Sequence, residues 1–225
     1  MKNQGQTGLC WAFSGVEQAE SYLMLKNSQS YNSSTTKIFS PRQVDYATSA
    51  NGIKDYTNPY GTRTLKTAGG NFSKFSVLAS LGLSLIDETK MPFDESTNQK
   101  ELNEVLNFNN SNYEVTETVD LPTIAVIKQA DSTYSSECSS NPSACEETIK
   151  AAYMEAIKRT VMNNGGALVS AVTPQGICGY GNTDGQKALS IHSVCYRSNT
   201  GHAMQVIGWD DNYSYTYCKT STGNT

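Results

Sequence analysis

The stretch that decides the fold is KNQGQTGLCWAFS, residues 2–14. Its first half is rich in Gly and Gln, a composition that favours a loop over regular secondary structure. Its second half begins an amphipathic helix, because apolar residues recur there at steps of three and four. These residues are Trp11, Phe13, Val16, Ala19 and Leu23. We therefore predict that the loop delivers Cys10 to the N-terminus of a helix.

This position favours a reactive thiol at Cys10, although most free cysteines are small buried hydrophobes. Unpaired backbone N–H groups at a helix N-terminus stabilise a thiolate by at most about 2 kcal/mol. At about 1.4 kcal/mol per pKa unit, this lowers a thiol pKa near 8.5 by about one and a half units. The thiol would then be only partly ionised at neutral pH, so a nucleophile also needs an imidazolium partner. The chain has two histidines, His192 and His202.

The second informative segment is GHAMQVIGWDDN, residues 201–212. A turn Gly precedes His202, and the apolar residues after it predict a strand that ends near Gly208. His202 would then lie at the start of this strand, exposed at an edge of the fold and not inside it. His192 lies in a segment without a recognisable motif, so we expect His192 to be structural and His202 to be the base.

Both segments resemble the active-site segments of papain-like cysteine peptidases, and the ending GWDDNY resembles bacterial surface members of that family. The resemblance implies a peptidase with an α+β fold of two lobes. We expect a helical left lobe over residues 1–109, carrying Cys10, and a β-rich, barrel-like right lobe over residues 110–225, carrying His202. Both lobes look truncated at their outer ends.

The resemblance also implies roles for further residues. Gln4 precedes Cys10 by the spacing at which the family places its oxyanion-hole Gln. Such a donor is worth about 3–4 kcal/mol of transition-state stabilisation, although Gln4 could instead merely tie down the loop. Substrate-binding positions implied by the resemblance are Gly8, Trp11, Gly69 and Gly70. A side chain at the Gly-Gly pair would block a substrate backbone, while the plain alternative is a turn.

Two departures from the family pattern stand out. The family usually has, where Thr7 stands, a Cys that forms a disulfide within the left lobe. It also orients its His with an Asn, but no segment after His202 matches that motif. We expect this Asn to lie beyond Thr225. Family members usually carry a propeptide ahead of the domain, and none is recognisable here.

The rest of the chain alternates helical and β patterns. Helices are predicted from Pro41 after an N-cap at Ser40, over 72–81, and over 149–164. Gly82 and Gly165 are expected to end the last two of these helices. Strands are predicted at 113–119, 124–127 and 167–172.

Composition limits the partners. The net charge is −4 and the basic residues do not cluster, so a nucleic acid is not expected. No apolar run approaches the roughly 18 residues of a membrane span. Neither metal nor organic cofactor is implied, and the expected partner is a peptide or protein substrate.

The cysteines point to an oxidising compartment. With Cys10 free, an odd number of the six remains. Pairs Cys138–Cys145 and Cys178–Cys195 are possible and would leave Cys218 without a partner, but a sequence does not fix connectivity. Disulfides would indicate an extracellular or cell-surface location.

Two other functions remain open. One is a papain-like domain that has lost activity and binds peptides or proteins. The other is an acyl transferase that uses the same Cys10–His202 pair with an acceptor other than water.

Overall fold

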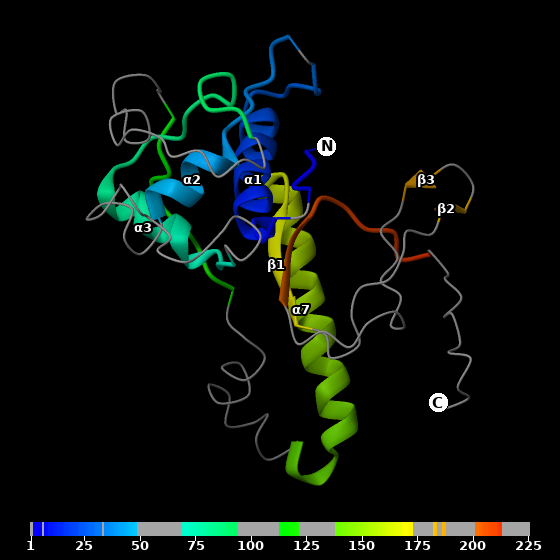
Figure 1. The fold of residues 1–225 in the computed structure, drawn as a ribbon. Coiled ribbons are helices and arrows are strands. Elements are labelled where there is room, and N and C mark those ends of the chain that lie inside the picture. Colours follow the sequence, from blue (N-terminus) through cyan, green and yellow to red (C-terminus); the bar gives the residue numbers. More distant parts are fainter. Residues whose placement is uncertain are drawn as a thin grey trace, which may run out of the picture.

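The computed structural model describes residues 2–5, 7–32, 34–48, 69–93, 113–121, 138–172, 182–183, 186–187 and 201–212. Helix α1 (Cys10–Lys26) lies between two groups of elements (Figure 1). On one side lie helices α2 (Pro41–Thr48) and α3 (Ser73–Leu81). On the other side lie helix α7 (Pro142–Asn164) and strands β1 (Ala167–Val172) and β4 (Gly201–Val206). The described residues therefore mix helices with a few strands. The predicted lobe boundary at 109/110 lies outside them.

Helix α1 spans Cys10–Lys26, which confirms the predicted helix start. The carbonyl of Leu9 accepts the N–H groups of Ala12 and Phe13 at 2.9 and 3.0 Å and so closes the first turn. The apolar side chains of this turn are buried, and Trp11 is completely inaccessible to solvent. Burial of this face fixes the helix start, and with it the position of Cys10.

The side of α1 that carries α2 and α3 holds the main core. Helix α2 spans Pro41–Thr48 and α3 spans Ser73–Leu81, as predicted. Ser40 caps α2, because its hydroxyl oxygen accepts the Gln43 N–H at 3.1 Å. Gly82 ends α3 with φ 61°. The hydrophobic core of this side includes Leu9, Trp11, Phe13, Val16, Phe39, Val44, Tyr46, Phe75, Leu78, Leu85, Ile86 and Met91.

The other side of α1 carries the strand with His202. Strand β1 (Ala167–Val172) pairs antiparallel with β4 (Gly201–Val206), and Ala171 lies opposite His202. Both strands were predicted. Two shorter strands, β2 (Asn182–Thr183) and β3 (Gln186–Lys187), form a separate antiparallel pair. These two-stranded pairs do not test the barrel-like arrangement, which stays a prediction.

Helix α7 spans Pro142–Asn164 and leads directly into β1. It starts earlier than predicted because Asn141 caps it, with its side-chain oxygen accepting the Ala144 N–H at 3.3 Å. Gly165 ends it with φ 74°, as expected for a helix stop. A Cβ at Gly165 would lie 2.6 Å from the Ser21 carbonyl oxygen, so Gly allows α7 to end directly against α1.

The predicted strand at 113–119 is wrong. Only Glu114 forms a β-bridge there, to Ser84, and the Leu85 N–H donates to the Tyr113 carbonyl at 2.8 Å. The segment that contains Ser84 then forms a second single bridge, between Asp87 and Phe39. Because this segment changes its pairing partner within a few residues, neither bridge extends into a ladder. The predicted strand at 124–127 lies outside the described residues.

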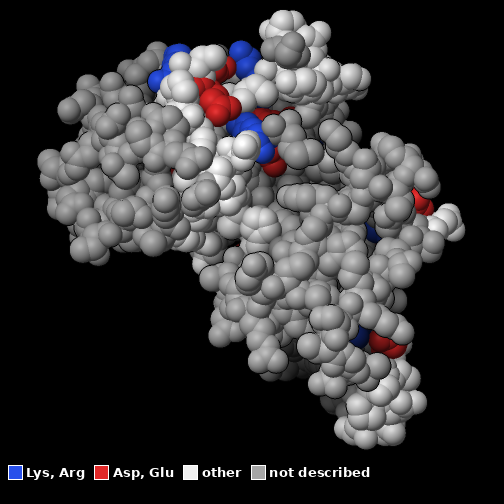
Figure 2. Space-filling model, turned by 45° about the vertical axis from the view of Figure 1, so that its right-hand side comes forward, with Lys and Arg blue, Asp and Glu red and all other residues white. Residues whose placement is uncertain are grey.

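The disulfide Cys138–Cys145 is formed and joins the residues before α7 to its first turn. Cys178, Cys195 and Cys218 lie outside the described residues. Among the helices that the structure describes, none is both long and apolar enough to cross a membrane. On the face in Figure 2, the basic and acidic side chains of the described residues are interspersed and form no patch of a single sign.

Candidate active site

The fold brings together two residues from opposite ends of the chain. Cys10 is the first residue of α1, and His202 is the second residue of β4. Their side chains form a hydrogen bond. The backbone N–H of Ala203 also donates to the Cys10 sulfur at 3.4 Å, and the Trp11 N–H at the helix start adds a further contact. The thiol thus has donors from both α1 and β4.

These contacts shift both titrations toward an ion pair. Burial raises the pKa of the Cys10 thiol, but the His202 hydrogen bond, the Ala203 N–H and the charge of His202 together hold that pKa below the ordinary thiol value. The hydrogen bond with Cys10 raises the pKa of His202, although burial opposes this. A thiolate beside an imidazolium is the form in which a Cys attacks an electrophilic carbon.

The loop before Cys10 is closed by contacts between Gln4 and Thr7. The Gln4 side-chain amide donates to the Thr7 carbonyl at 3.0 Å. In return, the Gln4 carbonyl accepts the Thr7 N–H at 3.3 Å and the Thr7 hydroxyl at 2.7 Å. Thr7 is buried, so a small hydrogen-bonded turn stands where the family usually has a disulfide. The Gln4 amide therefore does tie down the loop in this structure.

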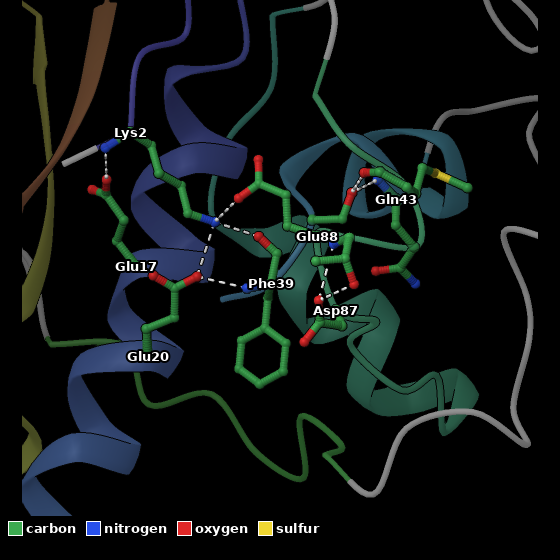
Figure 3. Close-up of polar contacts among 10 residues, drawn as sticks. Lys2, Glu17, Glu20, Phe39, Gln43, Asp87 and Glu88 are labelled. Atoms are coloured by element: carbon green, nitrogen blue, oxygen red, sulfur yellow. Dashed lines mark hydrogen bonds and ion pairs between the residues drawn. The ribbon is translucent and has the colours of Figure 1, made fainter. Parts of the chain in front are cut away.

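The start of the loop is anchored by charges at Lys2 (Figure 3). The Lys2 ammonium lies 2.9 Å from a Glu20 carboxylate oxygen and 3.2 Å from one of Glu88, and it donates to the Phe39 carbonyl. Glu20 in turn accepts the Phe39 N–H at 2.7 Å. Burial raises the pKa of Glu20, and the charge of Lys2 opposes that rise. The Lys2 anchor holds the loop against α1 and against the segment after it.

The four predicted substrate-binding residues differ in their surroundings. Gly69 and Gly70 are exposed, Gly8 is partly buried and Trp11 is fully buried. A Cβ at Gly70 would lie 2.6 Å from the Trp11 ring, whereas a Cβ at Gly69 would meet nothing within 4 Å. Gly70 is thus required by its packing on Trp11. The open space at Gly69 leaves room for a substrate backbone, and the substrate-binding roles of these residues stay predictions.

Polar contacts continue along the contact between α1 and β4. The Ser14 hydroxyl donates to the Ala203 carbonyl at 3.1 Å, and both residues are buried. Farther along α1, the Gln205 amide donates to the Gln18 side-chain oxygen at 3.2 Å and to the Ser21 hydroxyl at 3.1 Å. These contacts hold the His202 strand on the Cys10 helix.

Sequence reasoning missed three of these residues. Thr7 was seen only as a departure from the family, and Lys2 and Ser14 were not singled out, although they lie within the opening stretch. The spacing of Ser14, one helical turn after Cys10, was a usable signal. His192 lies outside the described residues. Within the described part of the chain, no group of three or more His, Cys, Asp or Glu side chains could hold a metal ion.

The family model described as papain family cysteine protease matches residues 1–223. A search of curated proteins finds no match to the chain.

Proposed function

Because the chain belongs to the papain family of cysteine proteases, we propose that it hydrolyses peptide bonds with Cys10 as nucleophile and His202 as general acid and base. The observation that carries the proposal is the hydrogen-bonded Cys10–His202 pair, with the thiol pKa lowered and the imidazole pKa raised. A buried structural cysteine would show the opposite shift, because burial alone raises a thiol pKa.

The reaction follows from this pair. The Cys10 thiolate attacks the carbonyl carbon of the substrate, a C–S bond forms, and the carbonyl oxygen becomes an oxyanion. The C–N bond then breaks, and the His202 imidazolium gives its proton to the leaving amine. Water attacks the thioester with His202 as base, which releases the acid and restores the ion pair.

Gln4 is the proposed oxyanion donor. Its amide carries two N–H hydrogens, so the bond to Thr7 leaves one that can meet an oxyanion. The backbone N–H of Cys10, at the first position of α1, is the proposed second donor. Removing the Gln4 donor by Gln4→Ala should lower kcat by about 10²–10³-fold.

The same proposal includes the lobes and the location. We propose a helical left lobe at 1–109 and a barrel-like right lobe at 110–225, with the substrate passing Gly8, Gly69 and Gly70. The buried Trp11 ring would support this path from beneath Gly70. An extracellular or cell-surface location is supported by the Cys138–Cys145 disulfide, because such bonds persist in oxidising compartments.

The test combines labelling with turnover. The full chain is treated with a thiol-directed epoxide, and hydrolysis of a mixture of unstructured peptides is followed by mass spectrometry. Cys10→Ala should abolish both signals, and His202→Ala should lower the rate by at least about 10²-fold, whereas His192→Ala should change little.

Four results would overturn parts of this proposal. Labelling of Cys10 no faster than that of free cysteine would remove the activated nucleophile. Rapid labelling without cleavage would indicate a binding domain, and peptide products joined to an added amine would indicate an acyl transferase. Loss of activity in His192→Ala alone would reassign the base.

A further inference from the structure

One turn of α1 holds both backbone polar groups of Ala203. The Ala203 N–H donates to the Cys10 sulfur at 3.4 Å, and the Ala203 carbonyl accepts the Ser14 hydroxyl at 3.1 Å. Residues four apart lie on one face of a helix, and the N–H and C=O of one strand residue point to the same side. The edge of β4 that does not pair with β1 therefore docks on the first turn of α1.

The contact at Ser14 is buried. Ser14 is 6% exposed and Ala203 is 7% exposed. A buried carbonyl needs a hydrogen-bond partner, and the Ser14 hydroxyl is the one that the structure gives to Ala203. Because its carbonyl accepts the Ser14 hydroxyl, Ala203 cannot turn its N–H away from the Cys10 sulfur without also breaking the bond to Ser14. His202, the preceding residue, is constrained with it.

We propose that Ser14 is a positioning residue for the active site: through the Ala203 carbonyl, its hydroxyl holds the Ala203 N–H and His202 on the Cys10 sulfur and so keeps the thiol reactive near neutral pH. This inference rests on the proposed peptidase function. In this arrangement Ser14 acts on the sulfur through Ala203. Among the described residues, His202 is the titratable side chain that acts on the Cys10 thiol, so a change in the titration of Cys10 reports the placement of β4.

The chain offers a matched control on the same helix. The Ser21 hydroxyl also contacts β4, but it accepts from the Gln205 side chain at 3.1 Å and lies almost two turns farther along α1. Ser21→Ala thus removes one contact between α1 and β4 without touching Ala203. Ser14→Thr is the conservative variant, because it keeps a hydroxyl at the position.

The experiment measures alkylation of Cys10 by iodoacetamide in the full chain across pH 4–10, an experimental range of about six units that brackets the ordinary His and Cys pKa values. Mass spectrometry of the peptide that contains Cys10 gives the rate. Ser14→Ala should shift the acid limb of the alkylation rate to higher pH by about one unit. At a given pH on that limb, alkylation should then be about tenfold slower. Ser14→Thr should restore most of the rate, and Ser21→Ala should follow the unaltered profile. kcat/KM should fall with kcat, while KM changes little.

The outcomes separate this inference from the proposed function. If the unaltered chain shows the profile of a free cysteine, the proposed function fails. If it shows a lowered acid limb that Ser14→Ala leaves in place, the positioning role is overturned, even if that variant melts at a lower temperature.

A second measurement covers the case in which Ser14→Ala does not fold. Hydrogen exchange of the unaltered chain is then followed by NMR. The Ala203 amide should exchange as slowly as the amides of β4 that pair with β1. Exchange at the rate of an exposed amide would overturn the inference.

Discussion

The two regions that meet at Cys10 are held to α1 in different ways. The loop with Gln4 is anchored by buried charges, because Lys2 lies between Glu20 and Glu88. The strand with His202 is held by neutral hydrogen bonds at Ala203 and Gln205. Removing one member of a buried ion pair leaves an uncompensated charge, whereas losing one neutral bond costs much less. Substitutions at the Lys2 anchor should therefore lower stability most, and loss of the Ser14 bond to Ala203 on the strand side should alter reactivity more than stability.

The largest effect is expected at Lys2. Lys2→Met leaves the Glu20 carboxylate buried without its ammonium partner and should lower the free energy of unfolding by about 3–5 kcal/mol. Urea unfolding at pH 7 measures this. Lys150→Met is the control, because the Lys150 side chain is half exposed on α7, and it should change stability by less than about 0.5 kcal/mol.

Protonation of Glu20 provides an internal check. Its pKa is raised in the folded protein, so the folded state takes up the proton more readily than the unfolded chain. The loss in free energy of unfolding caused by Lys2→Met should therefore shrink as the pH falls through that raised pKa. The loss should also be smaller in the double variant Lys2→Met/Glu20→Gln. A deficit that does not depend on pH would show that charge is not what holds the loop.

The next largest effect is expected at Gly165, where α7 ends against α1. Gly165→Ala places a Cβ 2.6 Å from the Ser21 carbonyl at φ 74°, so it should lower the free energy of unfolding by about 1–3 kcal/mol. Gly208→Ala is the matched control, because a Cβ there meets nothing within 4 Å. Thermal unfolding measures both variants. Equal stability of the two would mean that α7 can withdraw from α1 without loss.

The difference between the regions also explains what the sequence could predict. The helix starts at Cys10 and Pro41 and the stops at Gly82 and Gly165 follow from caps and local periodicity, which lie within a few residues of each boundary. The supposed strand at 113–119 failed because pairing depends on a distant partner, and Ser84 offered only one bridge.

The candidate site divides in the same way. The Cys10–His202 pair could be proposed because the thiol requires an imidazole and the chain has few. The Ser14 bond to Ala203 joins residues 189 positions apart, and no periodicity within either segment encodes that contact. The same holds for Lys2, whose ammonium contacts Glu88 and the Phe39 carbonyl, both far from it in the sequence.

The pH dependence of activity should report the strand side alone. The Cys10 contribution to stability is present above the ordinary thiol pKa and is lost as pH falls through its lowered value. The His202 contribution is present below about pH 6.5 and is lost as pH rises through its raised value. Activity needs the Cys10 thiolate and the His202 imidazolium together, so kcat/KM should fall both when the thiolate is protonated at low pH and when the imidazolium loses its proton at high pH. The plot of kcat/KM against pH should therefore be bell-shaped, and each limb should fall about tenfold per pH unit, which is about 1.4 kcal/mol.

The two limbs belong to the coupled pair, so both should change together in His202→Ala. Folded Lys2→Met, studied at a temperature where it is native, should keep the limbs in place, because Lys2 does not contact the pair. A shift of the limbs in Lys2→Met would show that the loop side also controls the titration of Cys10. The comparison between the two regions would then fail.

The smallest effect is expected at Thr7, the neutral contact on the charged side. Thr7→Val keeps the shape and the backbone bond to Gln4 but removes the hydroxyl that donates to the Gln4 carbonyl at 2.7 Å. We expect a loss of about 1 kcal/mol in stability. We also expect a several-fold fall in kcat, because the side chain of Gln4 depends on the same turn.

Thr48→Val is the matched control for Thr7→Val, since the buried Thr48 hydroxyl donates to the Val44 carbonyl at 2.7 Å within α2, away from the loop. Equal stability losses with a fall in kcat only for Thr7→Val would assign the turn a role in placing Gln4, whereas unchanged kcat in both would limit Thr7 to stability.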